Sequence, residues 1–449
     1  MATAKPKSLT IRSYDVGFGD CFLLTFHYNG KTGDRHVLID FGSTAQRKQV
    51  RKKPPAASKK KGAKKKPKPK DQMLLVAEDI RDRCQGKLHA VVATHRHKDH
   101  ISGFATNKAG TAPGDIIAAL KPNVVLQPWT EHPKARVNAK QAPSLTMKTK
   151  KGFVAALGNM HAISAAVLAE AERRRNKKMI GPVLFRELTF LGDDNLSNES
   201  AVKNLMTMGK NHYLNYGSKS GLERLLPGVK TTVLGPPTLE QTDKIKVQRH
   251  EHEGEFWQFQ AFANRFALKS EARIFRRAET YAALSAPPFT RWFIKRMRSV
   301  RGEQLLGIVR ALDRVMNNTS LILLFEVNGK KLLFPGDAQI ENWSYALSQP
   351  KVKTLLSKVN VYKVGHHGSR NATPKTLWGS FKNRSTKKTA PGRLITLMST
   401  MPNKHGKAST KTEVPRQTLK DALDKESKLI NTEELKGKKE IFLPCVIKF

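Results

Sequence analysis

The sequence predicts an α+β fold in which two mixed β-sheets pack face to face with helices on the outside. Strand-like runs occur in two groups, residues 8–129 and 231–399, and helical segments follow each group. The unbroken apolar run LHAVVAT at 88–94 indicates a strand buried on both faces. Two further apolar runs flank Asn328 and Gly329, which is typical of a hairpin. With 39% hydrophobic and 26% charged residues, the 449-residue chain is not globally disordered.

The first group of strands begins at residues 8–26, where SLTIRSYDVGFGDCFLLTF predicts two strands joined by a glycine-rich turn. HVLID at 36–40 predicts a third, short strand. An amphipathic segment at 73–84 predicts a helix, and it precedes the buried strand at 88–94. NVVLQPW at 123–129 predicts the next strand.

The second group of strands starts with TTVLGPP at 231–237. LILLFEV at 321–327 and KLLFP at 331–335 form the predicted hairpin. VNVYKVG at 359–365 and LITLMS at 394–399 predict two more strands. We therefore expect one domain over residues 1–449.

Three segments interrupt this domain in the sequence. Residues 43–71 are interpreted as a disordered basic loop, because thirteen Lys or Arg and no acid occur between Arg47 and Lys70. Residues 130–228 and 239–316 turn helical and basic, and we interpret them as helical insertions.

The charge of the chain predicts a polyanionic partner. Lys and Arg number 81 against 37 Asp and Glu, for a net charge of +44. Release of counterions on a nucleic acid is the preferred interpretation, and a solvated tether or localisation tag is the alternative for the basic loop. The candidate nucleic-acid-binding residues are Arg51, Lys52, Lys53, Lys64, Lys65, Lys66, Arg291, Lys295 and Arg296.

Cysteine usage and hydropathy exclude several classes of protein. Cys21, Cys84 and Cys445 are odd in number and far apart, which predicts neither a disulfide framework nor a zinc knuckle. No run of about 18 apolar residues is present, so we expect no membrane span. The start MATAKPKSLTIR lacks the apolar region of a secretory signal, which predicts a cytoplasmic location.

The motif THRHKDH at 94–100 directly follows the buried strand and concentrates metal-binding residue types. Residues i and i+2 of an extended stretch point the same way, so His95 and His97 can bind one metal ion. Asp99 and His100, at a following turn, can reach a second ion. The spacing therefore predicts a site for two ions.

Two further stretches carry ligand types at predicted strand ends. Asp337 lies in LLFPGDA at the end of a predicted strand, and its carboxylate has the chemistry to lie between two ions. His366 and His367 lie in VGHHGS, again where a strand stops. Strand ends that gather at one edge of a sheet would bring these residues to the first motif. Together they predict a dinuclear centre.

The order of these motifs resembles that of the metallo-β-lactamase superfamily, and within it the ComEC-like hydrolase domains of competence DNA uptake. The resemblance covers residues 9 to about 405, and its fold is an αββα sandwich. It rests on the motifs DVGFGD at 15–20, LIDFG at 38–42, THRHKDHISG at 94–103, LGPP at 234–237, NNTSLILLF at 317–325, LLFPGDA at 332–338 and KVGHHGS at 363–369.

The resemblance implies a role for each matching residue. His95 and His97 would ligate one metal, and Asp337 would bridge to a second metal held by Asp99, His100 and His367. Asp40 would orient ligands and water from behind the metals. Asn318 and Ser320 occupy the stretch from which most members supply a third His to the first metal. The candidate catalytic residues are Asp99, Asp337, His366 and His405, of which His405 would protonate a leaving group or hold a phosphate, with a plain surface histidine as the alternative.

These observations predict a hydrolase with two divalent ions, with Zn²⁺ expected and Mn²⁺ or Fe²⁺ as alternatives. A nuclease or phosphodiesterase is the leading hypothesis, because the charge favours a polyanion. The first alternative is a hydrolase of small phosphodiesters, lactones or thioesters. The second is a nucleic-acid-binding protein whose metal site is silent. DNA and RNA, endonuclease and exonuclease action, and the oligomeric state stay open.

Overall fold

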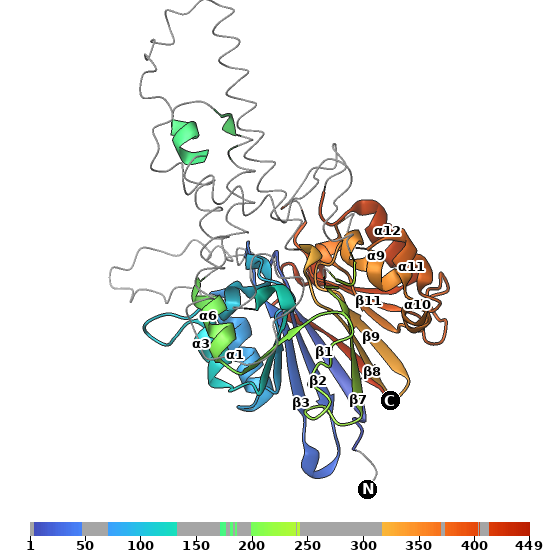
Figure 1. Cartoon of the computed structure of the whole chain (residues 1–449). Helices are drawn as coiled ribbons and strands as arrows, with labels where there is room; N and C mark the ends of the chain where they lie inside the picture. Colours follow the sequence, from blue (N-terminus) through green and yellow to red (C-terminus); the bar gives the residue numbers. More distant parts are fainter. Residues whose placement is uncertain are drawn as a thin grey trace, which may run out of the picture.

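The computed structural model describes residues 4–46, 71–132, 171–176, 180–182, 185, 199–238, 240–242, 317–369, 373–402, 404 and 413–449. These residues form two β-sheets with flanking helices (Figure 1). The predicted basic loop at 43–71 lies almost wholly outside the described residues, as does the predicted insertion at 239–316. No helix among the residues described is both long enough and apolar enough to cross a membrane.

The first sheet has seven strands in the order β13-β1-β2-β3-β4-β5-β6. The strands from β13 to β3 are antiparallel to their neighbours, whereas those from β3 to β6 run parallel. The sheet is therefore mixed. Its strands span Ser8–Tyr14 (β1), Cys21–His27 (β2), Arg35–Phe41 (β3), Ala90–Val92 (β4), Val124–Pro128 (β5), Lys210–Leu214 (β6) and Phe442–Lys448 (β13).

The second sheet has six strands in the order β12-β11-β10-β9-β8-β7. The strands from β12 to β9 are parallel, and the β9-β8-β7 part is antiparallel, with Asn328 and Gly329 at the predicted hairpin turn. The strands span Val229–Gly235 (β7), Ile322–Val327 (β8), Lys330–Phe334 (β9), Val361–Lys363 (β10), Ile395–Met398 (β11) and Lys428–Asn431 (β12).

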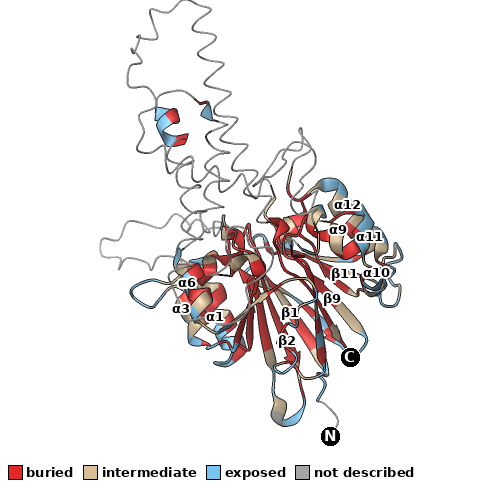
Figure 2. Ribbon diagram, in the orientation of Figure 1, coloured by how far each residue is buried: buried red, intermediate tan, exposed pale blue. Residues whose placement is uncertain are grey.

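The two sheets pack face to face through a shared hydrophobic core. Residues of both sheets form one buried cluster. Across it the Phe22 and Phe334 rings lie 6.0 Å apart, and Phe26 and Phe325 lie 6.4 Å apart. Figure 2 shows most residues of the central strands buried. The predicted α+β class, with two mixed sheets and helices outside, is confirmed.

Helices cover the outer faces of both sheets (Figure 1). Over the first sheet lie α1 (Gln72–Cys84), α3 (Pro113–Ala119) and α6 (Glu199–Thr207), and over the second lie α9 (Ile340–Ser348), α10 (Pro350–Ser357), α11 (Lys375–Ser380) and α12 (Gln417–Glu426). The Asp71 side chain caps α1 by accepting the Met73 N–H at 2.9 Å. Buried residues at helical spacing then face the sheet.

The structure differs from the predicted helical insertion at 130–228. Within that range α6 is helical, but Lys210–Leu214 forms β6 and pairs in parallel with β5. Among the described residues β6 has one neighbouring strand, and it is only half-buried, so its sequence KNHYL lacks the apolar run of a central strand. Residues 210–214 of the predicted insertion therefore belong to the first sheet.

The three cysteines form no disulfide bond, as their number and spacing predict. Cys21, Cys84 and Cys445 are all buried and free. Burial raises the pKa of Cys84 to about 12 and of Cys445 to about 11, which keeps these thiols protonated and unreactive.

A histidine pair at the start of β3 and β4 makes stability depend on pH. The backbone N–H of His36 donates a hydrogen bond to His89 Nδ1 at 3.1 Å, and both histidine side chains are buried. Burial lowers the pKa of each to about 4, and the Arg35 charge adds to the effect. The unfolded chain, with ordinary histidine pKa values of about 6.5, therefore takes up protons first as pH falls.

We expect the free energy of unfolding to fall as pH drops from 6.5 towards 4. A His36→Asn/His89→Asn variant should lose less stability over this range, because its side chains at these positions do not titrate. Denaturant unfolding of both proteins at pH 7 and pH 4.5 measures the difference. Equal losses in the two proteins would contradict the assignment.

Candidate metal centre

Stretches from both sheets end at the same edge and bring His and Asp side chains together. Asp40 lies near the end of β3, the 94–100 motif follows β4, Asp337 follows β9, and His367 follows β10. Asp20 immediately precedes β2, whose first residue pairs with the last residue of the antiparallel β3. The strand-end argument thus places all of these residues close together.

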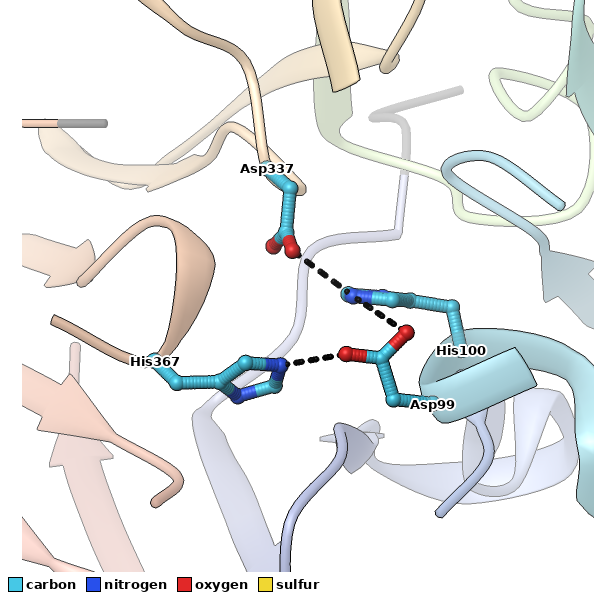
Figure 3. A group of neighbouring side chains, drawn as sticks. All are labelled: Asp99, His100, Asp337 and His367. Carbon is cyan, nitrogen blue, oxygen red and sulfur yellow. Dashed lines mark hydrogen bonds and ion pairs between the residues drawn. The ribbon is translucent and has the colours of Figure 1, made fainter. Parts of the chain in front are cut away.

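Four residues form the main candidate metal site (Figure 3). Asp99, His100, Asp337 and His367 are buried, and each offers a ligand atom within 4.8 Å of the others. His100 Nε2 lies 3.0 Å from Asp337 Oδ2, and His367 Nε2 lies 2.8 Å from Asp99 Oδ2. Their side chains point toward one another from three separate stretches (Figure 3). Nitrogen and oxygen donors in this arrangement fit a divalent metal.

Hydrogen bonds to the second ring nitrogens orient the imidazoles of His100 and His367. His100 Nδ1 donates to Asp40 Oδ2 at 2.8 Å, and His367 Nδ1 donates to the Ser399 carbonyl at 3.0 Å. In both rings Nε2 is therefore the nitrogen that faces the centre. Metal-binding histidines in proteins are commonly fixed through their second nitrogen in this way.

The local backbone holds these side chains in uncommon conformations. His366 and His367 have φ angles of 44° and 52°, and Asp40 has a φ of 54°. A Cβ at Gly336 would lie 2.7 Å from Thr94 Cβ, so only glycine lets the Asp337 stretch approach the first motif this closely. Strained residues of this kind cluster at functional sites in proteins.

A second candidate group consists of His95, His97 and Asp99. His95 Nε2 and His97 Nδ1 lie 3.0 Å apart, and Thr94 Oγ1 lies 3.2 Å from His95 Nδ1. Burial and the neighbouring His100 and His97 lower the pKa of His95 well below its ordinary value. The imidazole is therefore neutral, which is the form that binds metals.

The carboxylate common to both groups is Asp99, whereas the family resemblance implies that Asp337 bridges the metals. Asp337 Oδ1 accepts the His366 N–H at 3.0 Å and lies 3.4 Å from Lys363 Nζ. Only Oδ2 is left to face His100. Asp337 belongs to the main group only, and Asp99 belongs to both.

The charges of the site favour ionised carboxylates. Burial alone would raise the pKa of Asp337, but His100, Lys363 and His366 lower it well below its usual range. Burial alone would lower the pKa of His100, but the carboxylates of Asp337, Asp99 and Asp40 raise it well above its ordinary value. Asp337 is thus charged and ready to accept a cation.

Asp40 and Ser320 lie behind the ligands. Asp40 accepts the Thr94 N–H and the Thr94 hydroxyl, both at 2.7 Å, in addition to His100 Nδ1. Ser320 Oγ accepts the Asp337 N–H at 3.3 Å. Asn318, two residues before Ser320, is also buried. Its Oδ1 has no hydrogen-bond partner among the described residues.

His366 lies beside the main group, and it is more exposed than the four residues of that group. Its Nδ1 contacts Ser369 Oγ at 3.0 Å, and its Nε2 lies 4.0 Å from Asp337 Oδ2. With 26% of its side chain exposed, it can exchange a proton with solvent. The other predicted residues, His405 and all nine candidate nucleic-acid-binding cations, lie outside the described part of the chain.

Sequence reasoning missed two residues of the centre, Asp20 and Lys363. Lys363 Nζ forms an ion pair with Asp20 Oδ2, and Asp20 Oδ1 lies 3.5 Å from His367 Nδ1. Asp20, Asp40 and His100 make a third group of metal-binding residue types. Two features of the sequence point to these residues. Lys363 is the one charged residue inside the apolar run VNVYKVG, and Asp20 is the last residue of the DVGFGD motif.

The described part of the chain is thus an α+β protein whose buried His and Asp clusters could hold a metal ion. Comparison with models of protein families gave no match, and a search of curated proteins also found none.

Proposed function

We propose that this protein is a metal-dependent hydrolase of the metallo-β-lactamase type, and that it acts as a nuclease or phosphodiesterase with two divalent ions. The observation that carries the proposal is the meeting of Asp99 and His100 with Asp337 and His367. These residues come from three distant stretches, and their donor types suit Zn²⁺, with Mn²⁺ or Fe²⁺ as alternatives.

The proposed chemistry divides between the metals and the protein. Divalent ions at such a site supply Lewis-acid charge and lower the pKa of water to about 7. Asp99, His100, Asp337 and His367 would hold one ion, and His95 and His97 would hold the other together with Asp99. Asp40 and the Ser399 carbonyl orient the imidazoles of His100 and His367. His366 faces the centre and is partly exposed, so we assign it the proton that the leaving alkoxide needs.

The charge of the chain supports a polyanionic substrate. A net charge of +44 attracts nucleic acid through counterion release, and this term weakens steeply as salt rises. A small-molecule hydrolase would not need such a charge. A nucleic-acid-binding protein with a silent metal site would use the charge but not the buried ligands.

A single set of assays separates these functions. The purified chain is incubated with plasmid, single-stranded DNA or a small chromogenic phosphodiester, under Mn²⁺, Zn²⁺, Mg²⁺ or a chelator. We expect metal-dependent DNA cleavage that the chelator stops. Between 50 and 200 mM salt the affinity for DNA should fall by at least about tenfold, whereas turnover of the small diester should change little.

Other outcomes select the alternatives. Turnover of the small diester without cleavage of DNA would favour the small-molecule hydrolase. Salt-sensitive DNA binding with no turnover of any substrate under all three metals would favour the silent site.

A further inference from the structure

Lys363 places a positive charge in the interior of the second sheet. It is the last residue of β10, which has a parallel neighbour on each side, and it is 2% exposed. A buried charge is costly unless several partners compensate it. Here the ammonium has three, because it forms an ion pair with Asp20, lies 3.4 Å from Asp337 Oδ1 and donates to the Gly336 carbonyl at 3.2 Å.

These contacts connect Lys363 to two candidate ligands of the main group. At Asp337 the ammonium and the His366 N–H both face Oδ1, which leaves Oδ2 directed at His100. At His367 the link is indirect, since Asp20 Oδ1 lies 3.5 Å from the ring Nδ1. One ammonium thus contacts the stretch after β9 and, through Asp20, the histidine after β10.

We infer that Lys363 is a positioning residue of the metal centre, which fixes the Asp337 carboxylate so that Oδ2 alone faces a metal and which, through Asp20, supports the His367 ring. This inference rests on the metal centre proposed above. A lysine that served the fold alone would need only a counter-charge. The contact with an oxygen of a candidate ligand is what gives Lys363 the additional role.

The test removes the ion pair without changing the net charge. An Asp20→Asn/Lys363→Met variant loses one negative and one positive charge, so no unpaired charge is left in the interior. Affinity for Zn²⁺ is measured by competition with a chromophoric chelator, and stability by thermal unfolding. We expect the affinity to fall about 10- to 100-fold, as for other groups that orient ligands.

A matched control comes from the same sheet. Glu326 and Lys331 form an ion pair between β8 and β9, at the end of β9 remote from Asp337. Glu326→Gln/Lys331→Met removes a pair of the same charges, and this variant should keep the Zn²⁺ affinity of the wild type.

The outcomes distinguish this inference from the proposed function. Wild-type affinity in the folded Asp20→Asn/Lys363→Met variant would overturn the positioning role while leaving the metal centre intact. A wild-type protein that binds no Zn²⁺ would overturn both. If the double variant does not fold, Lys363→Met alone decides, because it removes the ammonium that faces Asp337 Oδ1; we expect about tenfold weaker binding, and unchanged binding would refute the inference.

Discussion

Asp337→Asn is expected to lower phosphodiester hydrolysis by at least about 100-fold. Substitution of groups that only orient metal ligands commonly costs 10- to 100-fold, and Asp337 is placed among the ligands themselves. The substitution keeps the size of the side chain and an oxygen for the His366 N–H. It removes the negative charge that faces His100 and Lys363. The rates on plasmid and on a small chromogenic diester measure the effect.

A matched control uses the same substitution on the surface. Asp82 is exposed on α1 and pairs with Arg81, so Asp82→Asn should leave both rates unchanged. If Asp337→Asn cleaved as fast as the wild type, the activity would come from another site or from a contaminant.

Asp99→Asn is expected to remove more bound metal than the loss of any histidine. Asp99 is the carboxylate shared by the two groups, so its loss weakens both. His97→Ala affects only the group that contains His95, and should spare an ion held by His100, Asp337 and His367. Elemental analysis of the dialysed proteins counts the ions that remain per chain.

Elemental analysis also tests whether Asp99 contributes to both metal-binding groups. An Asp99→Asn protein that kept the wild-type metal content would contradict it. A His97→Ala protein that lost all of its metal would show that the two groups do not bind independently.

Much of the centre could be predicted because its residues follow strand ends. His95, His97, Asp99 and His100 lie within one short motif after β4, and Asp337 and His367 follow β9 and β10. β4 lies in the first sheet and β9 and β10 lie in the second. Their carboxyl ends lie at the same edge of the two packed sheets, so side chains more than two hundred positions apart come within hydrogen-bond distance.

The remaining features depend on atomic detail that a sequence pattern does not carry. That Asp99 belongs to two groups follows from distances between ligand atoms, which the sequence does not give. Lys363 is unexpected in a buried strand until its partner Asp20 is known. β6 carries little strand signal in its sequence because, among the described residues, it is an edge strand with one neighbour and needs few apolar residues.

The central claim is that imidazoles and carboxylates from three distant stretches bind a divalent metal. Anomalous diffraction at the zinc edge, from crystals of the protein grown with Zn²⁺, tests it most directly. We predict a strong peak about 2.0–2.2 Å from His100 Nε2, His367 Nε2 and oxygens of Asp99 and Asp337. Ordered crystals that show no peak among these four residues would contradict the claim.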